Sequence, residues 1–277
     1  MTRSFLALLT AGMLACGGSR PPSLLTFDEF TALAPRAPYI VRLRHHSSGG
    51  ELLYYGARHT NDPTDPQIDE IERLWRSFRP TMAFNEGGNP PVPATRELAV
   101  RRIGEPGWLR FLAMRDSVPV TSLEPSRSAE VAALRRTFSE EHLKLFYVLR
   151  QVPSYGPRGD ARPVDQALAE ELRRAARTPG LEGPPNTVEE LVAACRRLLP
   201  QMPDCRDARD AWFNPTLHPE NGWTNEVSRQ SGYVRDVHMV ALLADAVRKG
   251  ARVFAVVGFG HVVMQERVLR HRLGAAP

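Results

Sequence analysis

The sequence predicts an α/β fold, with a central, mainly parallel sheet flanked by helices and an inserted helical lid segment. Short apolar stretches alternate with segments of helical period in the first half of the chain, as in parallel sheets with covering helices. Residues 126–232 are almost wholly helical in pattern, and a strand pattern returns only near the C-terminus. A length of 277 residues with 42% hydrophobic residues is enough for one sizeable core.

The first half of the chain predicts four strands and four helices, the first of them a short helix that starts at 26–30. Strands are expected over 39–43 and 51–56, with a turn at 45–50 between them. Apolar residues then recur at helical spacing until Pro80 stops the pattern, at Ile68, Ile71, Leu74, Trp75 and Phe78. A strand over 81–84, helices near 95–102 and 107–115, and a strand over 118–123 complete this half.

The second half predicts a helical insertion followed by the end of the sheet. Proline- and glycine-rich joints at 153–163 and 179–185 divide the helical segment, which we interpret as a lid over about 126–232 within a single domain of residues 37–277. The last helix before the final strand is expected over about 234–248, flanked by Gly232 and Gly250. It should bury Val237, Val240, Ala241, Ala244 and Val247. A strand over 253–257 and a closing helix from Val262 follow.

The N-terminus has the pattern of an export signal. Arg3 gives a positive start, the apolar run over 5–15 is too short to span a bilayer, and Cys16 follows it. Residues 13–16, Met-Leu-Ala-Cys, resemble a bacterial lipobox, in which the cysteine is lipidated; an ordinary secretory peptide is the other interpretation. We therefore expect a signal peptide over 1–16, a tether over 17–36, and an exported lipoprotein anchored in the outer membrane, facing the periplasm or the cell surface.

The charge pattern argues against a nucleic-acid partner, and the cysteines predict a disulfide. The net charge of +5 comes from basic residues scattered among acidic ones along helices, which is typical of solvated helix faces and not of a nucleic-acid partner. Apart from Cys16, the chain has Cys195 and Cys205 on either side of a short proline-containing segment. An even pair in an exported chain predicts a structural disulfide.

Four polar residues each follow a predicted strand. They stand in turns, three of them with glycine, at His59, Glu86, Glu124 and His261. In an open parallel sheet the ligand crevice lies outside the carboxyl ends of the strands, so residues distant in sequence can converge there. Each residue also has a purely structural interpretation: a turn satisfied by backbone for His59, and helix capping or a helix-terminal charge for Glu86 and Glu124. His261 is a less natural structural choice, since an imidazolium at a helix start opposes the helix dipole.

Two imidazoles and two carboxylates permit two chemistries. Neutral histidine and carboxylate both coordinate divalent metals such as zinc, manganese or cobalt, with His59, Glu86 and His261 as ligands and an open position to activate water. Without a metal, a histidine poised by a carboxylate can act as general base for the attack of water on a carbonyl. The sequence alone leaves both open.

Arg235 is a further candidate, at the start of the last long helix. It stands on the same row as Met239 and Leu242, where an apolar residue is expected. A half-buried arginine needs an anion, for which Glu124, Glu86 or a substrate carboxylate are candidates. The alternative is a surface arginine folded back over its own helix.

These motifs together resemble the Tiki and TraB-like family within the erythromycin-esterase-like and ChaN-like superfamily. The similar motifs are Gly-x-x-His, Glu-x-Gly, Leu-Glu, Arg-(Asp/Asn)-x-x-Met and Val-Gly-x-Gly-His. They lie here at 56–59, 86–88, 123–124, 235–239 and 257–261. The turn at Glu86 continues with two glycines, and Met264 stands where a glycine often follows the late histidine.

The resemblance implies a hydrolase-like site that cleaves an ester or amide bond in a small-molecule or peptide substrate. His59, Glu86 and His261 would bind a metal or activate water, with Glu124 and Arg235 in support. Because members of this superfamily do not share one chemistry, a non-catalytic haem- or metal-binding periplasmic lipoprotein is the alternative. Its haem ligand would come from His45, His46, Tyr54 or Tyr55. A third alternative is a degenerate family member that serves as a surface interaction module.

Overall fold

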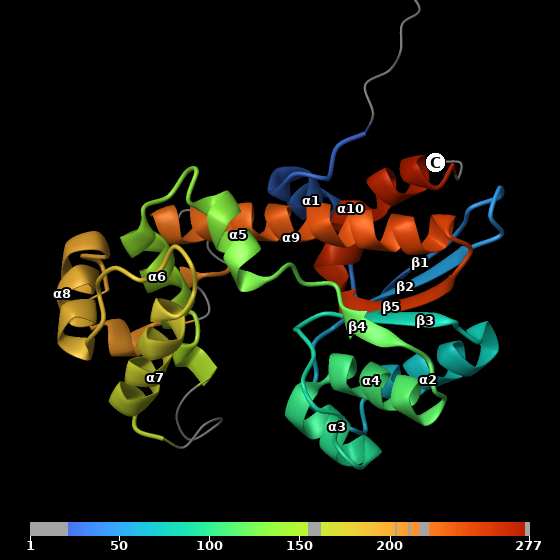
Figure 1. Cartoon of the computed structure of the whole chain (residues 1–277), viewed down its shortest axis with the longest axis horizontal. Coiled ribbons are helices and arrows are strands. Elements are labelled where there is room, and N and C mark those ends of the chain that lie inside the picture. The colour runs from blue at the N-terminus through green and yellow to red at the C-terminus, as the bar shows by residue number, and fades with distance from the viewer. Residues whose placement is uncertain (1–21, 155–161, 203, 210–211, 216–221, 275–277) are drawn as a thin grey trace, which may run out of the picture.

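The computed structural model describes residues 22–154, 162–202, 204–209, 212–215 and 222–274, and it shows the expected α/β fold (Figure 1). A central sheet carries helices on both faces, and a group of helices stands beside it. The signal peptide, the lipobox and the first residues of the tether, 17–21, lie outside the described residues, whereas residues 22–36 are described and include the helix α1 (Phe27–Leu33), which contacts α10 and is not a free linker. None of the described helices combines the length and the apolar character that a membrane span requires.

The sheet has five strands in the order β1-β2-β5-β3-β4. In chain order they are β1 (Tyr39–Arg44), β2 (Glu51–Ala57), β3 (Met82–Asn85), β4 (Val120–Ser122) and β5 (Arg252–Gly258). β1 pairs antiparallel with β2 as a hairpin, and the other neighbours are parallel. The register pairs Ala57 with Gly258 and Asn85 with both Val256 and Ser122. The four parallel strands therefore end at one edge of the sheet.

One face of the sheet packs on α9 (Gly222–Arg248) and α10 (Phe259–Arg272), with α1 (Phe27–Leu33) against α10. Alternate residues of β2 and β5, including Tyr54 and Ala255, point to this face and share a core with Met239 and Leu243. The C-terminal half of α9 is thereby fixed on the sheet, which matters because this half carries Arg235.

The other face packs on α2 (Pro66–Phe78), α3 (Arg96–Ile103) and α4 (Glu105–Arg115). α2 begins where the Asp65 side chain accepts a hydrogen bond from the Gln67 amide and Pro66 occupies the first turn. It ends at Arg79, which adopts the left-handed conformation with φ 50°. Ile68, Ile71 and Trp75 are buried at helical spacing, as the sequence predicts.

The helices that lie between β4 and β5 in the chain form a separate group, here called the cap, with a hydrophobic core of its own. Its elements are α5 (Arg127–Leu134), α6 (Glu140–Leu149), η1 (Val152–Ser154), α7 (Val164–Ala176), α8 (Val188–Leu198) and η2 (Cys205–Asp207). The N-terminal half of α9 packs into this core through Val227. α9 therefore runs from the cap onto the sheet and ties the two together (Figure 1).

The last long helix differs from the sequence prediction. It begins at Gly222, not near residue 234, and passes through Gly232 without a break. Val237 and Ala241 are exposed, and Met239 and Leu243 are buried in their place. A glycine inside a helix only weakens it, by about 1 kcal/mol, so packing on both the cap and the sheet carries the helix across this position.

Cys195 and Cys205 are free cysteines in the structure, both buried in the cap core. Their side chains interact, and this contact raises the pKa of the Cys195 thiol and lowers that of Cys205. The disulfide is not formed here, although the two thiols are neighbours. It stays a prediction for the exported protein.

Candidate functional site

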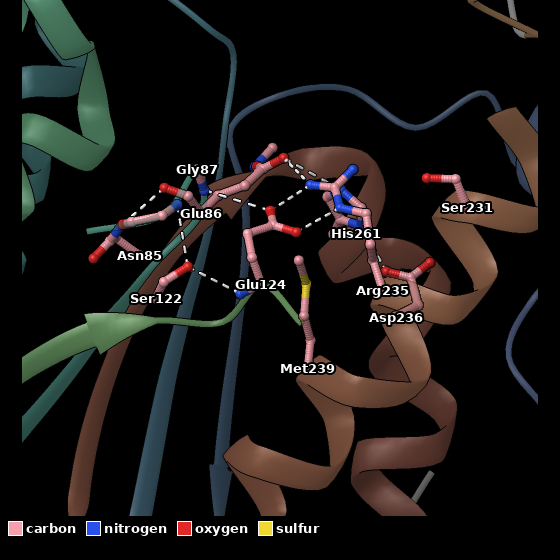
Figure 2. A network of polar contacts seen from close by, with 12 residues as sticks. Asn85, Glu86, Gly87, Ser122, Glu124, Ser231, Arg235, Asp236, Met239 and His261 are labelled. Atoms are coloured by element: carbon pink, nitrogen blue, oxygen red, sulfur yellow. Dashed lines mark hydrogen bonds and ion pairs between the residues drawn. The ribbon is translucent and has the colours of Figure 1, made fainter. Parts of the chain in front are cut away.

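The edge of the sheet where the parallel strands end brings the sequence-predicted residues together, and Figure 2 shows Glu86, Glu124, Arg235 and His261 there. Glu86 directly follows β3, Glu124 lies two residues after β4, and His59 lies two residues after β2. His261 stands in the first turn of α10, immediately after β5. These positions meet because the register aligns the ends of β2, β5, β3 and β4.

Arg235 lies between the two carboxylates at the strand ends. Its Nε and Nη2 donate to Glu124 Oε2 and Oε1 at 2.7 and 2.6 Å, and Nη2 also donates to Glu86 Oε1 at 2.7 Å. Burial alone would lower the pKa of Arg235, but the two glutamates raise it above its ordinary value. The side chain is 18% exposed, so Arg235 is not a surface arginine folded over its own helix. It joins α9 to β3 and β4 through a bidentate ion pair.

His261 is held between two carboxylates. Its Nδ1 lies 2.5 Å from Asp236 Oδ1, and its Nε2 lies 3.4 Å from Glu86 Oε1. Burial alone would lower the pKa of His261, but the charges of Asp236 and Glu86 outweigh burial and raise the pKa to about 10. The two carboxylates thus offset the unfavourable interaction between a protonated histidine and the positive N-terminal end of the α10 dipole. His261 is an imidazolium at neutral pH.

Glu86 is held as a carboxylate by three surrounding donors. Its Oε2 accepts a hydrogen bond from the Gly258 amide at 2.7 Å, and Oε1 faces Arg235 and His261. Burial would raise the pKa of Glu86, but the charges of His261 and Arg235 and the Gly258 amide keep it well below its ordinary value. The residues after Glu86 are not helical, so Glu86 is not the cap of a following helix. Glu124 is likewise no cap, since the Ser126 side chain caps α5.

His59 has one buried partner and an exposed ring. Its side chain is 69% exposed, and Nδ1 lies 3.5 Å from Oε2 of Glu105, which is 1% exposed. The Glu105 contact raises the pKa of His59, against the opposing effect of burial. The other ring nitrogen lies beside Gly258: a Cβ added to that glycine would stand 2.9 Å from His59 Nε2 and 3.4 Å from Glu86 Oε2. Gly258 is required here for space, because its backbone conformation is an ordinary one.

The sequence interpretation gives no role to two carboxylates of this site: Asp236, which it includes only as part of the motif at 235–239, and Glu105, which it does not single out. Both are almost fully buried, at 2% and 1% exposure. Glu105 Oε1 accepts hydrogen bonds from the Thr60 amide and from Gln67 Nε2, and Asp236 Oδ1 accepts one from Gln265 Nε2 at 2.6 Å. The sequence does contain a sign of each burial, because each carboxylate lies on the apolar face of its helix. Asp236 is three residues before Met239, and Glu105 is three before Trp108.

A cavity of about 420 Å³ opens beside Glu86, within the size range of small-molecule sites. It is lined from the strand ends and from the cap, by Glu86, Gly87, Gly88, Glu124, Pro125, Arg127, Glu130, Arg150 and Arg235. Gly87 and Gly88 both have φ of 84°, which favours glycine, so the backbone turns sharply at the cavity wall. His59 and His261 are not among the residues that line the cavity, and both lie next to its wall at Glu86: His261 Nε2 is 3.4 Å from Glu86 Oε1, and His59 Nε2 faces the same glycine, Gly258, as Glu86 Oε2.

The donor geometry does not favour a bound divalent metal. Among the residues that the structure describes, no group of three or more histidine, cysteine, aspartate or glutamate side chains is placed to hold one. Both oxygens of Glu86 already accept from Arg235 and Gly258, and the guanidinium of Arg235 occupies the place of a cation between Glu86 and Glu124. A metal would have to displace the guanidinium of Arg235, whose Nη2 lies 2.7 Å from Glu86 Oε1 and 2.6 Å from Glu124 Oε1.

The four candidate haem ligands lie elsewhere. Tyr54 and Tyr55 are completely buried, and their hydroxyl groups donate to Gln265 and Glu70. His45 and His46 lie in the turn between β1 and β2, at the opposite ends of the strands from Glu86. These positions give a haem iron no axial ligand at the cavity.

The chain matches no protein-family model, no curated protein and no solved structure. The function of the site must therefore be inferred from its own geometry.

Proposed function

We propose that this protein is a hydrolase of the Tiki/TraB and erythromycin-esterase-like type, which cleaves an ester or amide bond with water activated by His59. The observation that carries the proposal is the pairing of an exposed imidazole with a buried carboxylate. Glu105 contacts Nδ1 of His59 and leaves Nε2 beside Glu86 and Gly258. A carboxylate in this position fixes the tautomer and stabilises the imidazolium that forms when the histidine accepts a proton.

His59, and not His261, is the base because the two imidazoles differ in their carboxylate partners and in exposure: His261 lies between Asp236 and Glu86, whereas His59 has an exposed ring. His261 is protonated at neutral pH, since its pKa is raised to about 10. A group that already carries its proton cannot accept another from water. His59 has one carboxylate partner and an exposed ring, so it can exchange protons with a bound water.

The other charged residues of the site set the electrostatic environment of His59. Arg235 and His261 keep Glu86 ionised, and Glu86 in turn stabilises positive charge on His59 when the proton is transferred. In the proposed reaction His59 takes a proton from water as the water oxygen attacks the acyl carbon. The imidazolium then returns the proton to the leaving oxygen or nitrogen. The arginines that line the cavity would attract the negative charge that develops on the acyl oxygen.

The cap supplies one wall of the cavity through Arg127, Glu130 and Arg150. Ser231 joins α9 to the cap by donating a hydrogen bond to Glu130 Oε1 at 2.6 Å, and Tyr147 of α6 donates to the same oxygen at 2.7 Å within the cap. We propose that the cap selects the substrate, because the strand ends alone leave the cavity open on this side.

The proposal is tested by hydrolysis assays on purified protein, with a panel of nitrophenyl esters and peptide nitroanilides. We expect turnover in the wild type and a loss of about 100-fold or more in His59→Ala, the range for removal of a general base. His46→Ala is the matched control, because it removes an exposed histidine in the β1–β2 turn. Glu105→Gln should lower the pKa on the rising limb of the pH profile, since Glu105 raises the pKa of His59.

Equal turnover in wild type and His59→Ala would contradict the proposal. Tight haem binding, seen as a Soret band on titration, with no hydrolysis across the panel would favour the non-catalytic lipoprotein instead. An unchanged cellular phenotype after His59→Ala and His261→Ala would favour the interaction module.

A further inference from the structure

The cavity beside Glu86 contains three arginines, and two of them have carboxylate partners. Arg235 forms the ion pairs with the strand-end glutamates. Arg127, at the start of α5, lies 3.9 Å from Glu130 Oε2 and stacks over the ring of Tyr147 at 4.2 Å. This second pair is loose, because Glu130 directs its other oxygen to Tyr147 and Ser231.

The third arginine, Arg150, has no carboxylate partner among the residues that the structure describes. It follows the last turn of α6, and its guanidinium lies 5.3 Å from the centre of the Phe146 ring. Arg150 is an exposed residue, and partial burial together with the positive charges of Arg235 and Arg127 lowers its pKa, whereas the charge of Glu130 acts in the opposite direction. A guanidinium placed against two like charges, at the wall of a cavity, is an arrangement that a bound anion stabilises.

We propose that Arg150 binds a carboxylate group of the substrate, so that the hydrolase acts on an acyl compound carrying a second, anionic end. This inference rests on the proposed function and specifies its substrate class. A guanidinium presents two parallel N–H groups that match a carboxylate. A monoanion fits better than a phosphate dianion, because Glu86, Glu124 and Glu130 line the same cavity and repel additional negative charge.

The placement of Arg150 orients such a substrate. Arg150 belongs to the cap wall, whereas Glu86 and the neighbouring His59 belong to the strand ends. A carboxylate held by Arg150 would therefore leave the scissile bond on the sheet side of the cavity. The volume of about 420 Å³ is suited to a small acyl molecule.

The test measures binding without turnover, by saturation-transfer NMR with butyrate and its neutral isostere butyramide. We expect a signal from butyrate and none from butyramide in the wild type, and a loss of about tenfold or more in butyrate affinity in Arg150→Gln. Arg136→Gln is the matched control, since it removes an exposed arginine of the cap that does not line the cavity. A second arm compares hydrolysis of p-nitrophenyl butyrate with that of the mono-p-nitrophenyl ester of glutarate, whose KM alone should rise in Arg150→Gln.

The inference is overturned if butyrate binds equally to wild type and Arg150→Gln, or if inorganic phosphate binds more tightly than butyrate. It is also overturned if hydrolysis depends on His59 but the two esters have the same KM. Arg150-dependent binding of butyrate with no hydrolysis of either ester would support the carboxylate site and contradict the proposed hydrolase.

Discussion

The charge of His261 should make the stability of this protein depend on pH. In the folded protein the pKa of His261 is raised from 6.5 to about 10 by Asp236 and Glu86, against the effect of burial. A raised pKa stabilises the folded state fully below the unfolded value, and this stabilisation is lost as pH rises through the folded value. The window is therefore pH 6.5 to about 10. This shift corresponds to a stabilisation on the order of 5 kcal/mol.

The substitution Asp236→Asn removes the charge of Asp236, which raises the pKa of His261 more than Glu86 does. At an effective dielectric of 20, two unit charges about 4 Å apart interact by about 4 kcal/mol, so removal of the Asp236 charge should lower the pKa of His261 by about 2 units or more. We expect the pH dependence of the free energy of unfolding to shrink accordingly between pH 6.5 and about 10. Urea unfolding at several pH values and NMR titration of the imidazole Cε1–H measure the two quantities.

His271→Gln serves as control, because it removes an exposed histidine from the end of the same helix. The NMR titration of the wild type tests the reasoning even if Asp236→Asn does not fold. A wild-type His261 that titrates near 6.5 would refute it, as would the same midpoint in wild type and Asp236→Asn.

Three further predictions concern the same site. Arg235→Met should destabilise the protein by about 3 to 5 kcal/mol in urea unfolding, since it leaves Glu124 without its counter-charge and leaves Glu86 with His261 alone; adding Glu124→Gln should recover part of the loss, and full additivity would argue against the ion pair. Gly258→Ala should displace the His59 ring and reduce hydrolysis with little loss of stability, whereas Gly232→Ala, in open space within α9, should stabilise by about 0.5 to 1 kcal/mol. Elemental analysis should find no stoichiometric metal that Glu86→Ala removes, and such a loss would restore the metal hypothesis.

Local patterns predict the sheet and its helices well. Apolar runs such as that of β5 and the helical spacing of Ile68, Ile71 and Trp75 depend on burial alone, which the residue types record directly. The boundaries of α9 are different. The glycine at 232 indicates an end, but the helix continues because its two halves are buried in two cores, which no local window contains.

The residues at the strand ends are predictable as a group, because parallel strands end at a common edge. Their individual environments are not. Asp236 and Glu105 are buried beside His261 and His59 by helices that pack on opposite faces of the sheet. Which histidine becomes a cation and which keeps an exposed ring follows from that packing.

The sequence by itself determines the α/β architecture and the convergence of His59, Glu86, Glu124 and His261, since both follow from burial patterns and chain direction. Tertiary structure alone decides the charge at the site. It places Arg235 between Glu86 and Glu124, raises the pKa of His261 and leaves Arg150 without a carboxylate partner among the described residues. The physical reason is that electrostatic energies depend on distances of a few ångströms between groups far apart in the chain, and these distances exist only once the helices have packed.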